Sequence, residues 1–219
     1  EEMVAFLQEH GAPFDLSDFA EFYARIEEPT RTEDRGYTVY KQGFGSQGPV
    51  LLQTLNILEN FDLQAMGHNS ADYVHTIIEA MKLAYADRDT YYADPDFVDV
   101  PAKGLLSKVY GTTRAAAIDM TRASVAFKAG DPLPHDPDVD QWKYWVADIE
   151  DGRATEDAPG SFGPSAGGVK DTTHIAVIDK DGNIFDSTPS GGWIGGAVIL
   201  GKTGIGLSTR GEQFWLDED

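Results

Sequence analysis

Two adjacent threonines, Thr172 and Thr173, stand at the start of an apolar run that predicts a β-strand over 173–179. A hydroxyl nucleophile at the start of a buried strand is what a self-cleaving amidase with an N-terminal nucleophile needs. If the bond between Asp171 and Thr172 is cut, Thr172 gains a free α-amine beside its own hydroxyl. Since an α-amine has a pKa of about 7.7–8.0, it can serve as a general base near neutral pH. Thr172 is therefore a candidate nucleophile that carries its own base.

The same threonines also have a purely structural explanation. β-branched residues suit strands, so a Thr-Thr pair at the start of a strand requires no chemistry. His174, the next residue, is most simply a strand residue whose ring is satisfied by hydrogen bonds. The residues alone leave both interpretations open.

A glycine-rich segment over 43–48 has the spacing of a dinucleotide-binding loop and lies between a predicted strand and a predicted helix. A dinucleotide site also needs a second parallel strand that ends in an acidic residue about 20 positions further on. The residues after the helix instead predict another helix. We therefore interpret 43–48 as a tight loop, where free amides of the helix start could hold a substrate carboxylate.

No residue pattern predicts a metal site. The acidic stretches 136–140 and 179–183 look superficially like calcium loops, but their glycine and acidic positions do not match. The five histidines have no metal-ligand spacing, and the absence of cysteine excludes thiolate sites and disulfides. We expect no metal and no cofactor. A Ser-His-Asp triad stays open, although the chain has no Gly-x-Ser-x-Gly sequence.

The composition excludes two classes of partner. The 219 residues include 37 acidic and 17 basic ones, which gives a formal net charge of −20. Such a charge argues against nucleic-acid binding and against anionic membrane surfaces. No apolar run approaches the roughly 20 residues that span a bilayer. The first residues predict an acidic helix start and not a signal peptide, as in the middle of something longer.

The elements of the first half follow from apolar spacing and capping residues. A helix is expected over 1–10, ending at Gly11, and a second helix begins after Asp15. Its expected apolar stripe consists of Phe19, Phe22, Tyr23 and Ile26. A short strand over 37–40 precedes the glycine-rich loop. Pro49 then suits the first turn of a helix that runs to about Asn60.

The longest predicted helix begins at Asn69 or Ser70, either of which can cap it, and ends before the turn residues 91–96. Apolar residues at helical spacing predict its buried face. They are Val74, Ile77, Ile78, Met81 and Tyr85.

The second half changes character twice. From about 129 to 168 it is rich in Pro, Gly and Asp, and so long a loop is usually functional or processed. Strands are then expected over 173–179, 184–188 and 197–200, joined by Asp-Gly and Gly-Gly turns. Because both faces of 173–178 are largely apolar, we expect that strand to be covered on both sides.

The segment around Thr172 resembles one known family. Residues 171–183, DTTHIAVIDKDGN, look like the start of the small subunit of gamma-glutamyltranspeptidases. Four upstream segments resemble the large subunit and occur in the family's order. They are RGYTVY at 35–40, LNILE at 55–59, EAMKLAYADR at 79–88 and DPDFV at 94–98. The matches cover nearly the whole chain.

The resemblance implies an α/β fold, the αββα sandwich of N-terminal-nucleophile hydrolases, incomplete in this chain. Residues 1–171 then form the C-terminal part of the large-subunit region, and 172–219 the start of the small-subunit region. The family's donor-carboxylate Arg and its oxyanion Gly-Gly pair fall outside the chain, so we expect a central fragment. Its partners would be the remaining segments of the same precursor. A periplasmic or secreted location is compatible with the family, but no residue here assigns one.

The resemblance also assigns roles to residues. It implies self-cleavage between Asp171 and Thr172, with Thr172 as the nucleophile and new N-terminus and Thr173 as its neighbour in the motif. Ser190 matches a Thr that hydrogen-bonds near the nucleophile and assists processing. Ser46 lies where the family has a Ser- and Gly-rich segment lining the site.

Three positions depart from the family. Gly192 stands in place of an Asn, and Arg210 and Gln213 stand in place of a Gln and an Asp that help to hold the donor's α-amino group. Losing the carboxylate removes the partner of an α-ammonium, and a guanidinium repels one. We therefore expect an acyl group that lacks a free α-amine or carries extra carboxylates.

Three functions follow as hypotheses. The first is an amide hydrolase or acyltransferase that forms an acyl-enzyme from a small γ-glutamyl-type amide and passes the acyl group to water or an amino acid. The second keeps the chemistry but uses another acyl amide or polyglutamate. The third is an unprocessed, inactive homologue with a binding or structural role.

Overall fold

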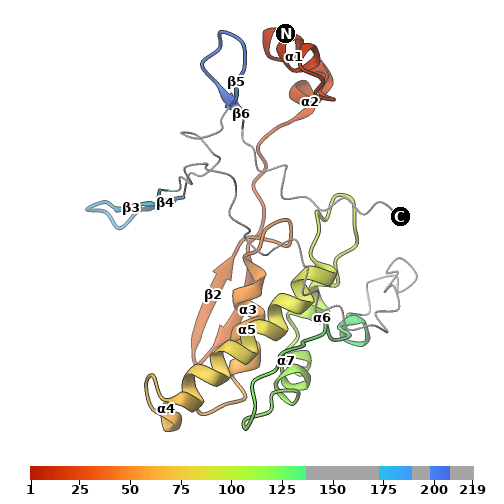
Figure 1. The fold of residues 1–219 in the computed structure, drawn as a ribbon. Helices are drawn as coiled ribbons and strands as arrows, with labels where there is room; N and C mark the ends of the chain where they lie inside the picture. Colours follow the sequence, from red (N-terminus) through yellow and green to blue (C-terminus); the bar gives the residue numbers. More distant parts are fainter. Residues whose placement is uncertain (137–172, 189–197, 208–219) are drawn as a thin grey trace. The chain divides into compact units, whose positions relative to one another are not determined.

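The computed structural model describes residues 1–136, 173–188 and 198–207, and it is a mixture of helices and strands (Figure 1). The chain divides into two units. The first comprises Glu1–Arg25 with Pro159–Asp219, and the second comprises Ile26–Ala158. In the described part of the chain, none of the helices combines the length and apolar composition needed to cross a membrane.

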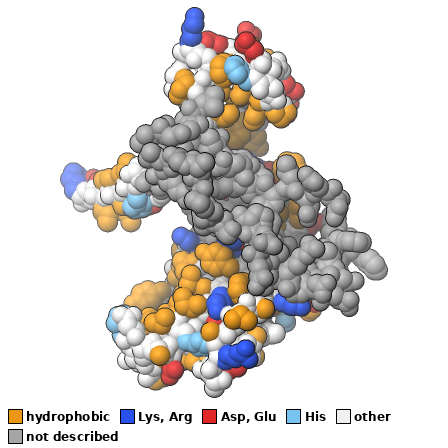
Figure 2. All heavy atoms as spheres, in the orientation of Figure 1, with side chains coloured by type: hydrophobic (Ala, Val, Ile, Leu, Met, Phe, Trp, Pro, Cys, Tyr) orange, Lys and Arg blue, Asp and Glu red, His pale blue; other side chains and the backbone are white. Residues whose placement is uncertain are grey.

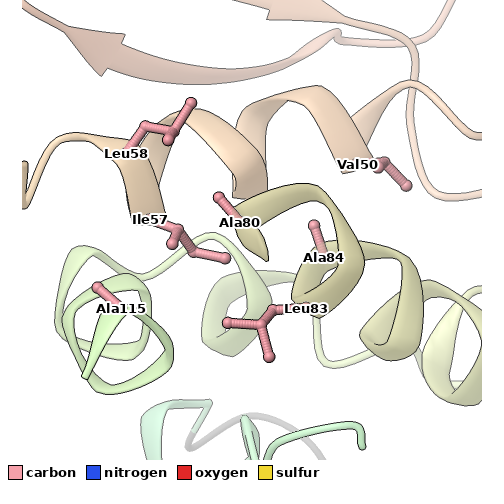
Figure 3. Packing of buried hydrophobic residues seen from close by; sticks show 7 residues of the cluster. All are labelled: Val50, Ile57, Leu58, Ala80, Leu83, Ala84 and Ala115. Atoms are coloured by element: carbon pink, nitrogen blue, oxygen red, sulfur yellow. The ribbon is translucent and has the colours of Figure 1, made fainter. Parts of the chain in front are cut away.

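The second unit is built around α3 (Pro49–Leu58), which packs against α5 (Ala71–Tyr91), α7 (Lys108–Ala115) and β1 (Thr30–Asp34). Figure 3 shows the small and branched side chains that fill the space between these helices. The core residues are Val50, Ile57, Leu58, Ala80, Leu83, Ala84 and Ala115. A second buried cluster consists of Phe44, Tyr91, Leu105 and Tyr110.

The strand predicted over 37–40 is confirmed as β2 (Tyr37–Lys41), which pairs antiparallel with β1. The strand β1 itself was not predicted from the sequence. The connecting turn places Arg35 and Gly36 at φ 47° and 87°. Two consecutive positive φ values match the right-handed twist of the flanking strands, so the turn holds this hairpin tightly.

The helix starts agree with the capping chemistry. Pro49 occupies the first turn of α3, and the Oγ of Ser70 accepts a hydrogen bond of 3.1 Å from the amide of Tyr73 at the start of α5. Both positions confirm the prediction. Three shorter elements of this unit were not predicted, and neither was α7. They are α4 (Leu63–Met66), α6 (Ala102–Leu105) and the 3₁₀ turn η1 (Leu133–His135).

The predicted buried face of α5 is wrong. Val74 and Ile78 are each 46% exposed, and Met81 and Tyr85 are exposed as well; only Ile77 packs against the core. Apart from Leu83, the helix instead buries small and polar residues and Tyr91, because α3 and α7 approach closely over its alanines and supply hydrogen-bond partners. The buried residues are Thr76, Glu79, Ala80, Leu83, Ala84, Ala86, Asp87 and Tyr91. Figure 2 shows hydrophobic side chains on the surface of the second unit.

In the first unit, α1 (Glu2–Glu9) buries Val4 and Leu7 and is followed by Gly11 at φ 79°, as predicted. Asp15 caps α2 (Leu16–Glu21) through a reciprocal capping box with Asp18. The helix stops earlier than expected, because the backbone is extended at the residue after Glu21. None of its residues is buried, so the predicted apolar stripe is wrong.

The remaining strands form two hairpins. The strands β3 (Ile175–Ile178) and β4 (Ile184–Ser187) pair antiparallel, as do β5 (Val198–Ile199) and β6 (Gly206–Leu207). All four residues of β3 are exposed, so the described part of the chain does not show the expected cover on both faces. Within the described ranges each sheet has two strands. The αββα sandwich and the subunit division stay predictions.

Candidate active site

A carboxylate closes the turn between β3 and β4. The Oδ1 of Asp179 accepts hydrogen bonds of 2.9 Å from the amides of Asp181 and Asn183, and its Oδ2 accepts one of 2.8 Å from Nδ2 of Asn183. Gly182 has φ 83°, a value that glycine adopts without strain. The hydrogen bonds from Asn183 hold the pKa of Asp179 below its ordinary value. The turn predicted from 179–183 is confirmed.

The hairpin register determines which side chains share a face. Ala176 pairs with Asp186, and Ile178 pairs with Ile184. Because side chains alternate along strands, His174 lies on the same face as these residues. Thr173 has the opposite parity, and its side chain is exposed.

On that face His174 connects two side chains of the partner strand. Its Nδ1 lies 2.9 Å from Oγ1 of Thr188, and its Nε2 lies 3.3 Å from Oδ2 of Asp186. A carboxylate can only accept, so Nε2 carries the hydrogen in that contact; Nδ1 accepts from the Thr188 hydroxyl in the neutral tautomer and donates to it in the protonated ring. The prediction that hydrogen bonds satisfy the ring is confirmed, but β3 begins at Ile175, so His174 precedes the strand. Sequence reasoning missed the two partners of the ring, although counting residues outward along both strands from the Asp-Gly turn would have identified them.

Most of the predicted site residues lie outside the described part of the chain. Among the predicted catalytic and cleavage residues, only Thr173 falls within it. The others, including the substrate-binding positions after the hairpin, are Asp171, Thr172, Ser190, Gly192, Arg210 and Gln213.

Ser46 closes the glycine-rich loop before α3. Its Oγ donates a hydrogen bond of 2.9 Å to the carbonyl of Gly43 and accepts one of 3.1 Å from the amide of Gly48. The neighbouring Phe44 is buried, with its ring edge-on to that of Tyr92 at 4.8 Å. The segment is a tight loop, as predicted, and α3 leads into the short helix α4 and not into a strand. Ser46 and the β3–β4 hairpin belong to different units of the chain.

A buried ion pair lies in the second unit and was not predicted. Asp87 is fully buried, and its Oδ1 lies 3.1 Å from Nη2 of Arg114. The carboxylate also accepts hydrogen bonds from Nε2 of Gln53 at 3.2 Å and from the amide of Gly130 at 2.8 Å. Burial raises the pKa of Asp87, although the charge of Arg114 and the hydrogen bond from the Gly130 amide oppose the rise. No local pattern could have identified these partners, which are distant in sequence.

The ion pair and neighbouring side chains hold residues 128–136 against the helices. Nη2 of Arg114 donates to the carbonyl of Lys128 at 2.7 Å, and the hydroxyl of Tyr91 donates to the carbonyl of Gly130 at 2.8 Å. Further along, Oδ2 of Asp136 accepts hydrogen bonds from the amides of Lys103 and Gly104. These contacts hold residues 128–136, which include the start of the segment predicted as a processed loop, 129–168.

A cavity of about 290 Å³ lies beside this stretch, between α5, α7 and residues 124–129. Glu79 and Arg114 contribute its charged wall, and Leu83, Ile118 and Phe127 contribute apolar surface. Neither Ser46 nor Thr173, the predicted site residues that the structure describes, lines it. Across the ranges that the structure describes, no group of three or more His, Cys, Asp or Glu side chains could hold a metal ion.

Comparison with known proteins defines the class. The sequence profile of the family described as "Gamma-glutamyltranspeptidase" matches residues 1–219. The chain belongs to the gamma-glutamyltranspeptidase family. The resemblance seen in the sequence is thereby confirmed.

The relatives are named as enzymes and as proenzymes. The chain is 32% identical over 216 residues to a glutathione hydrolase proenzyme of Escherichia coli, covering 98% of this chain and 32% of the relative. It is 34% identical over 218 residues to the "Glutathione hydrolase-like YwrD proenzyme" of Bacillus subtilis, covering 99% and 34%. The crystal structure of a cephalosporin acylase from Bacillus halodurans matches with a TM-score of 0.72 and 27% identity, covering 100% and 33%. The chain therefore spans about a third of the length of these relatives.

Proposed function

We propose that this chain is the central part of a self-cleaving amide hydrolase or acyltransferase, with Thr172 as its nucleophile. The observation that carries the proposal is the register of the β3–β4 hairpin. It pairs Ile175 with Ser187, and each further step along one strand is matched by a step back along the other. Thr172 stands three residues before Ile175 and Ser190 three residues after Ser187, and we propose that the pairing continues to them.

Directly opposed residues of an antiparallel pair have Cβ atoms about 4.5–5.5 Å apart. Two hydroxyl side chains at that separation can share a hydrogen bond. Ser190 would then orient the hydroxyl of Thr172 during cleavage of the bond after Asp171. The family resemblance implies the same relation for the two positions.

The chemistry after cleavage uses one residue for two tasks. The hydroxyl of Thr172 attacks the amide carbonyl of the substrate, and its free α-amine takes up the hydroxyl proton. The α-amine then passes that proton to the departing amine, and an ester links the acyl group to Thr172. Water or an amino acid attacks this ester, so hydrolysis and transfer differ only in the acceptor.

The substrate class follows from the relatives. The two curated relatives are named as glutathione hydrolase and glutathione hydrolase-like proenzymes. A small γ-glutamyl amide is accordingly the first candidate substrate. A proenzyme name also agrees with cleavage into two parts, which here would separate 1–171 from 172–219. The remaining large- and small-subunit segments of the same precursor would complete the αββα sandwich and the site.

A second candidate keeps the mechanism and changes the acyl group. The match to a cephalosporin acylase favours it, as do Gly192 in place of the family's Asn and Arg210 and Gln213 at the positions that would hold a donor α-amino group. A guanidinium at such a position suits an additional carboxylate and repels an ammonium. The acyl group would then lack a free α-amine, or the substrate would be a polyglutamate.

Intact mass of the whole protein tests the proposal against an inactive, unprocessed homologue. We expect two fragments, the second beginning at Thr172, and we expect Thr172→Ala to leave a single uncut chain. Thr113→Ala is the matched control, because it removes an exposed hydroxyl from α7. A wild-type protein that stays uncut, or cleavage of Thr172→Ala at the wild-type rate, would contradict the proposal.

A further inference from the structure

We propose that the cavity beside α5 and α7 is a binding site for a free amino acid with an apolar side chain, held between the carboxylate of Glu79 and the guanidinium of Arg114. The inference goes beyond the proposed function and does not depend on it. All the residues that line the cavity fall within 79–129, so a single unit of the chain supplies the whole site.

The cavity has the size and the lining of a site for a small molecule. Its volume is about 290 Å³, at the lower end of the range of about 300–1,000 Å³ that holds drug-sized ligands. Leu83, Ile118 and Phe127 contribute apolar surface, and several alanines lie between them and the polar groups. Such a cavity suits a molecule about as large as an amino acid, with its apolar side chain against these walls.

Two charged side chains of opposite sign line the same cavity, and both are buried. Glu79 is 4% exposed and Arg114 is 7% exposed. Water and salt screen charges less in such a sheltered place than at the surface, so each group can hold a ligand charge of the opposite sign firmly. A free amino acid carries an ammonium and a carboxylate on one carbon atom. It therefore offers a partner to both side chains at once.

Arg114 has a donor left for the carboxylate of the ligand. Its Nη2 lies 3.1 Å from Oδ1 of Asp87 and donates to the carbonyls of Leu83 at 3.1 Å and Lys128 at 2.7 Å. Its Nε is buried and has no hydrogen-bond partner among the residues that the structure describes. A buried N–H without an acceptor costs free energy. The proposed ligand supplies the missing acceptor with its carboxylate.

Glu79 has acceptor positions left for the ammonium of the ligand. Its Oε1 accepts a hydrogen bond of 2.7 Å from Nζ of Lys82, and its Oε2 accepts one of 3.2 Å from the amide of Ser124. Burial pushes the pKa of Glu79 upward, but these hydrogen bonds and the charge of Lys82 outweigh burial and hold the pKa below its ordinary value. An ionised carboxylate accepts about four hydrogen bonds, so two positions are available to an ammonium.

The same two side chains hold the wall that residues 124–129 form. Glu79 accepts from the amide of Ser124 at one end of this wall, and Arg114 donates to the carbonyl of Lys128 near the other. A ligand that binds both Glu79 and Arg114 therefore also favours the folded position of the wall. Because a ligand that binds only the folded state stabilises it, binding should raise the melting temperature.

Thermal unfolding and isothermal titration calorimetry of the full-length protein with L-leucine test the proposal. Two analogues of leucine each lack one charge: 4-methylpentanoate lacks the ammonium, and 3-methylbutylamine lacks the carboxylate. We expect leucine to bind and to raise the melting temperature. Each analogue should bind about tenfold more weakly or worse, as the loss of one hydrogen bond between charged groups predicts.

The first pair of variants tests the charge of the site. Glu79→Gln keeps the shape of the side chain and an acceptor for the amide of Ser124, but it removes the partner of the ammonium. Its affinity for leucine should fall about tenfold or more. Glu59→Gln is the matched control, because it removes the same charge from an exposed pair with Lys108. It should bind leucine as the wild type does.

The second pair tests the cavity itself and leaves its charges in place. Ile118→Trp fills the space that the apolar side chain of leucine would occupy, so leucine binding should be lost. Val109→Trp adds the same bulk at an exposed position of α7 and should leave binding unchanged. The melting temperature of each variant without ligand shows that it is folded.

Three results would overturn the inference. The first is a wild-type protein that does not bind leucine at millimolar concentrations, as when another part of the precursor fills the cavity. The second is wild-type affinity in both Glu79→Gln and Ile118→Trp. The third is loss of leucine binding in Thr172→Ala, which would place leucine at the proposed nucleophile. Undiminished self-cleavage of Thr172→Ala would instead contradict the proposed function and leave this inference standing.

Discussion

The carboxylate of Asp87 and the guanidinium of Arg114 form an ion pair of 3.1 Å in the interior of the second unit. The pair joins α5 to α7 and, through the amide of Gly130 and the carbonyl of Lys128, to the chain that follows. A buried charge is costly unless its partners are in place. This relationship therefore links the helical core to the segment that continues toward the proposed cleavage site.

Asp87→Ala should destabilise the second unit strongly. The substitution leaves a buried guanidinium without its carboxylate, a change that costs about 3–5 kcal/mol. Urea unfolding followed by helical circular dichroism measures the free energy of unfolding. The control is Glu59→Ala, which breaks the exposed pair of Glu59 with Lys108 and should cost about 1 kcal/mol or less. Equal stabilities of the two variants would contradict the role assigned to the buried pair.

Gly104→Ala should be poorly tolerated. A Cβ at Gly104 would overlap the carbonyl oxygen of Pro132 and lie 3.1 Å from Cβ of Asp136. Since the first clash is with backbone, the segment around η1 must shift, at a cost of about 1–3 kcal/mol. Gly43→Ala is the comparison, because a Cβ there meets nothing within 4 Å. Thermal unfolding of both variants checks the expectation, and a melting temperature for Gly104→Ala equal to that of Gly43→Ala would refute it.

The turn of the β3–β4 hairpin should weaken in acid. Hydrogen bonds from Asn183 lower the pKa of Asp179 in the folded state. A lowered folded pKa means that the contribution is complete above the unfolded value of about 3.9 and is lost as the pH falls through the lower folded value. The amide chemical shift of Asn183 should report this loss on acid titration. In Asp179→Asn the transition should disappear, and a wild-type midpoint above the ordinary Asp range would contradict the assignment.

The double substitution of Arg210→Gln with Gln213→Asp should shift substrate preference. It returns the side chains that the family uses near a donor α-amino group, so an α-ammonium gains a carboxylate partner and loses a repelling guanidinium. We expect kcat/KM for a γ-glutamyl anilide to rise about tenfold or more relative to an anilide without the α-amine. Efficient wild-type turnover of the γ-glutamyl anilide, with ordinary inhibition by glutathione, would show that the pocket is conventional.

The local elements were predictable because their causes are local. The caps of Asp15 and Ser70, the first-turn position of Pro49 and the turn at 179–183 each depend on hydrogen bonds or backbone angles within a few residues. The strand β1 escaped prediction, because its residues, TRTED, carry no apolar alternation. Its pairing with β2 depends on the turn at Arg35 and Gly36.

The buried face of α5 shows where sequence reasoning fails. Apolar spacing favoured a face that includes Val74 and Ile78, but the helix buries Glu79, Ala80 and Asp87. A helix pattern counts apolar residues, whereas burial depends on which neighbour packs against the helix and what partners it offers. The amide of Gly130, 43 residues away, is one of the groups that make burial of Asp87 possible.

The sequence by itself determined the family, the candidate nucleophile Thr172 and the turn that pairs the strands beyond it. Motifs and turns depend on residues that are neighbours in the chain, so the sequence is enough to identify them. Only the tertiary structure decided that His174 contacts Thr188 and Asp186 and that Asp87 pairs with Arg114. These contacts join residues that are distant in the chain, and their strength depends on register, burial and the exact approach of two elements. Such quantities arise only when the chain is folded.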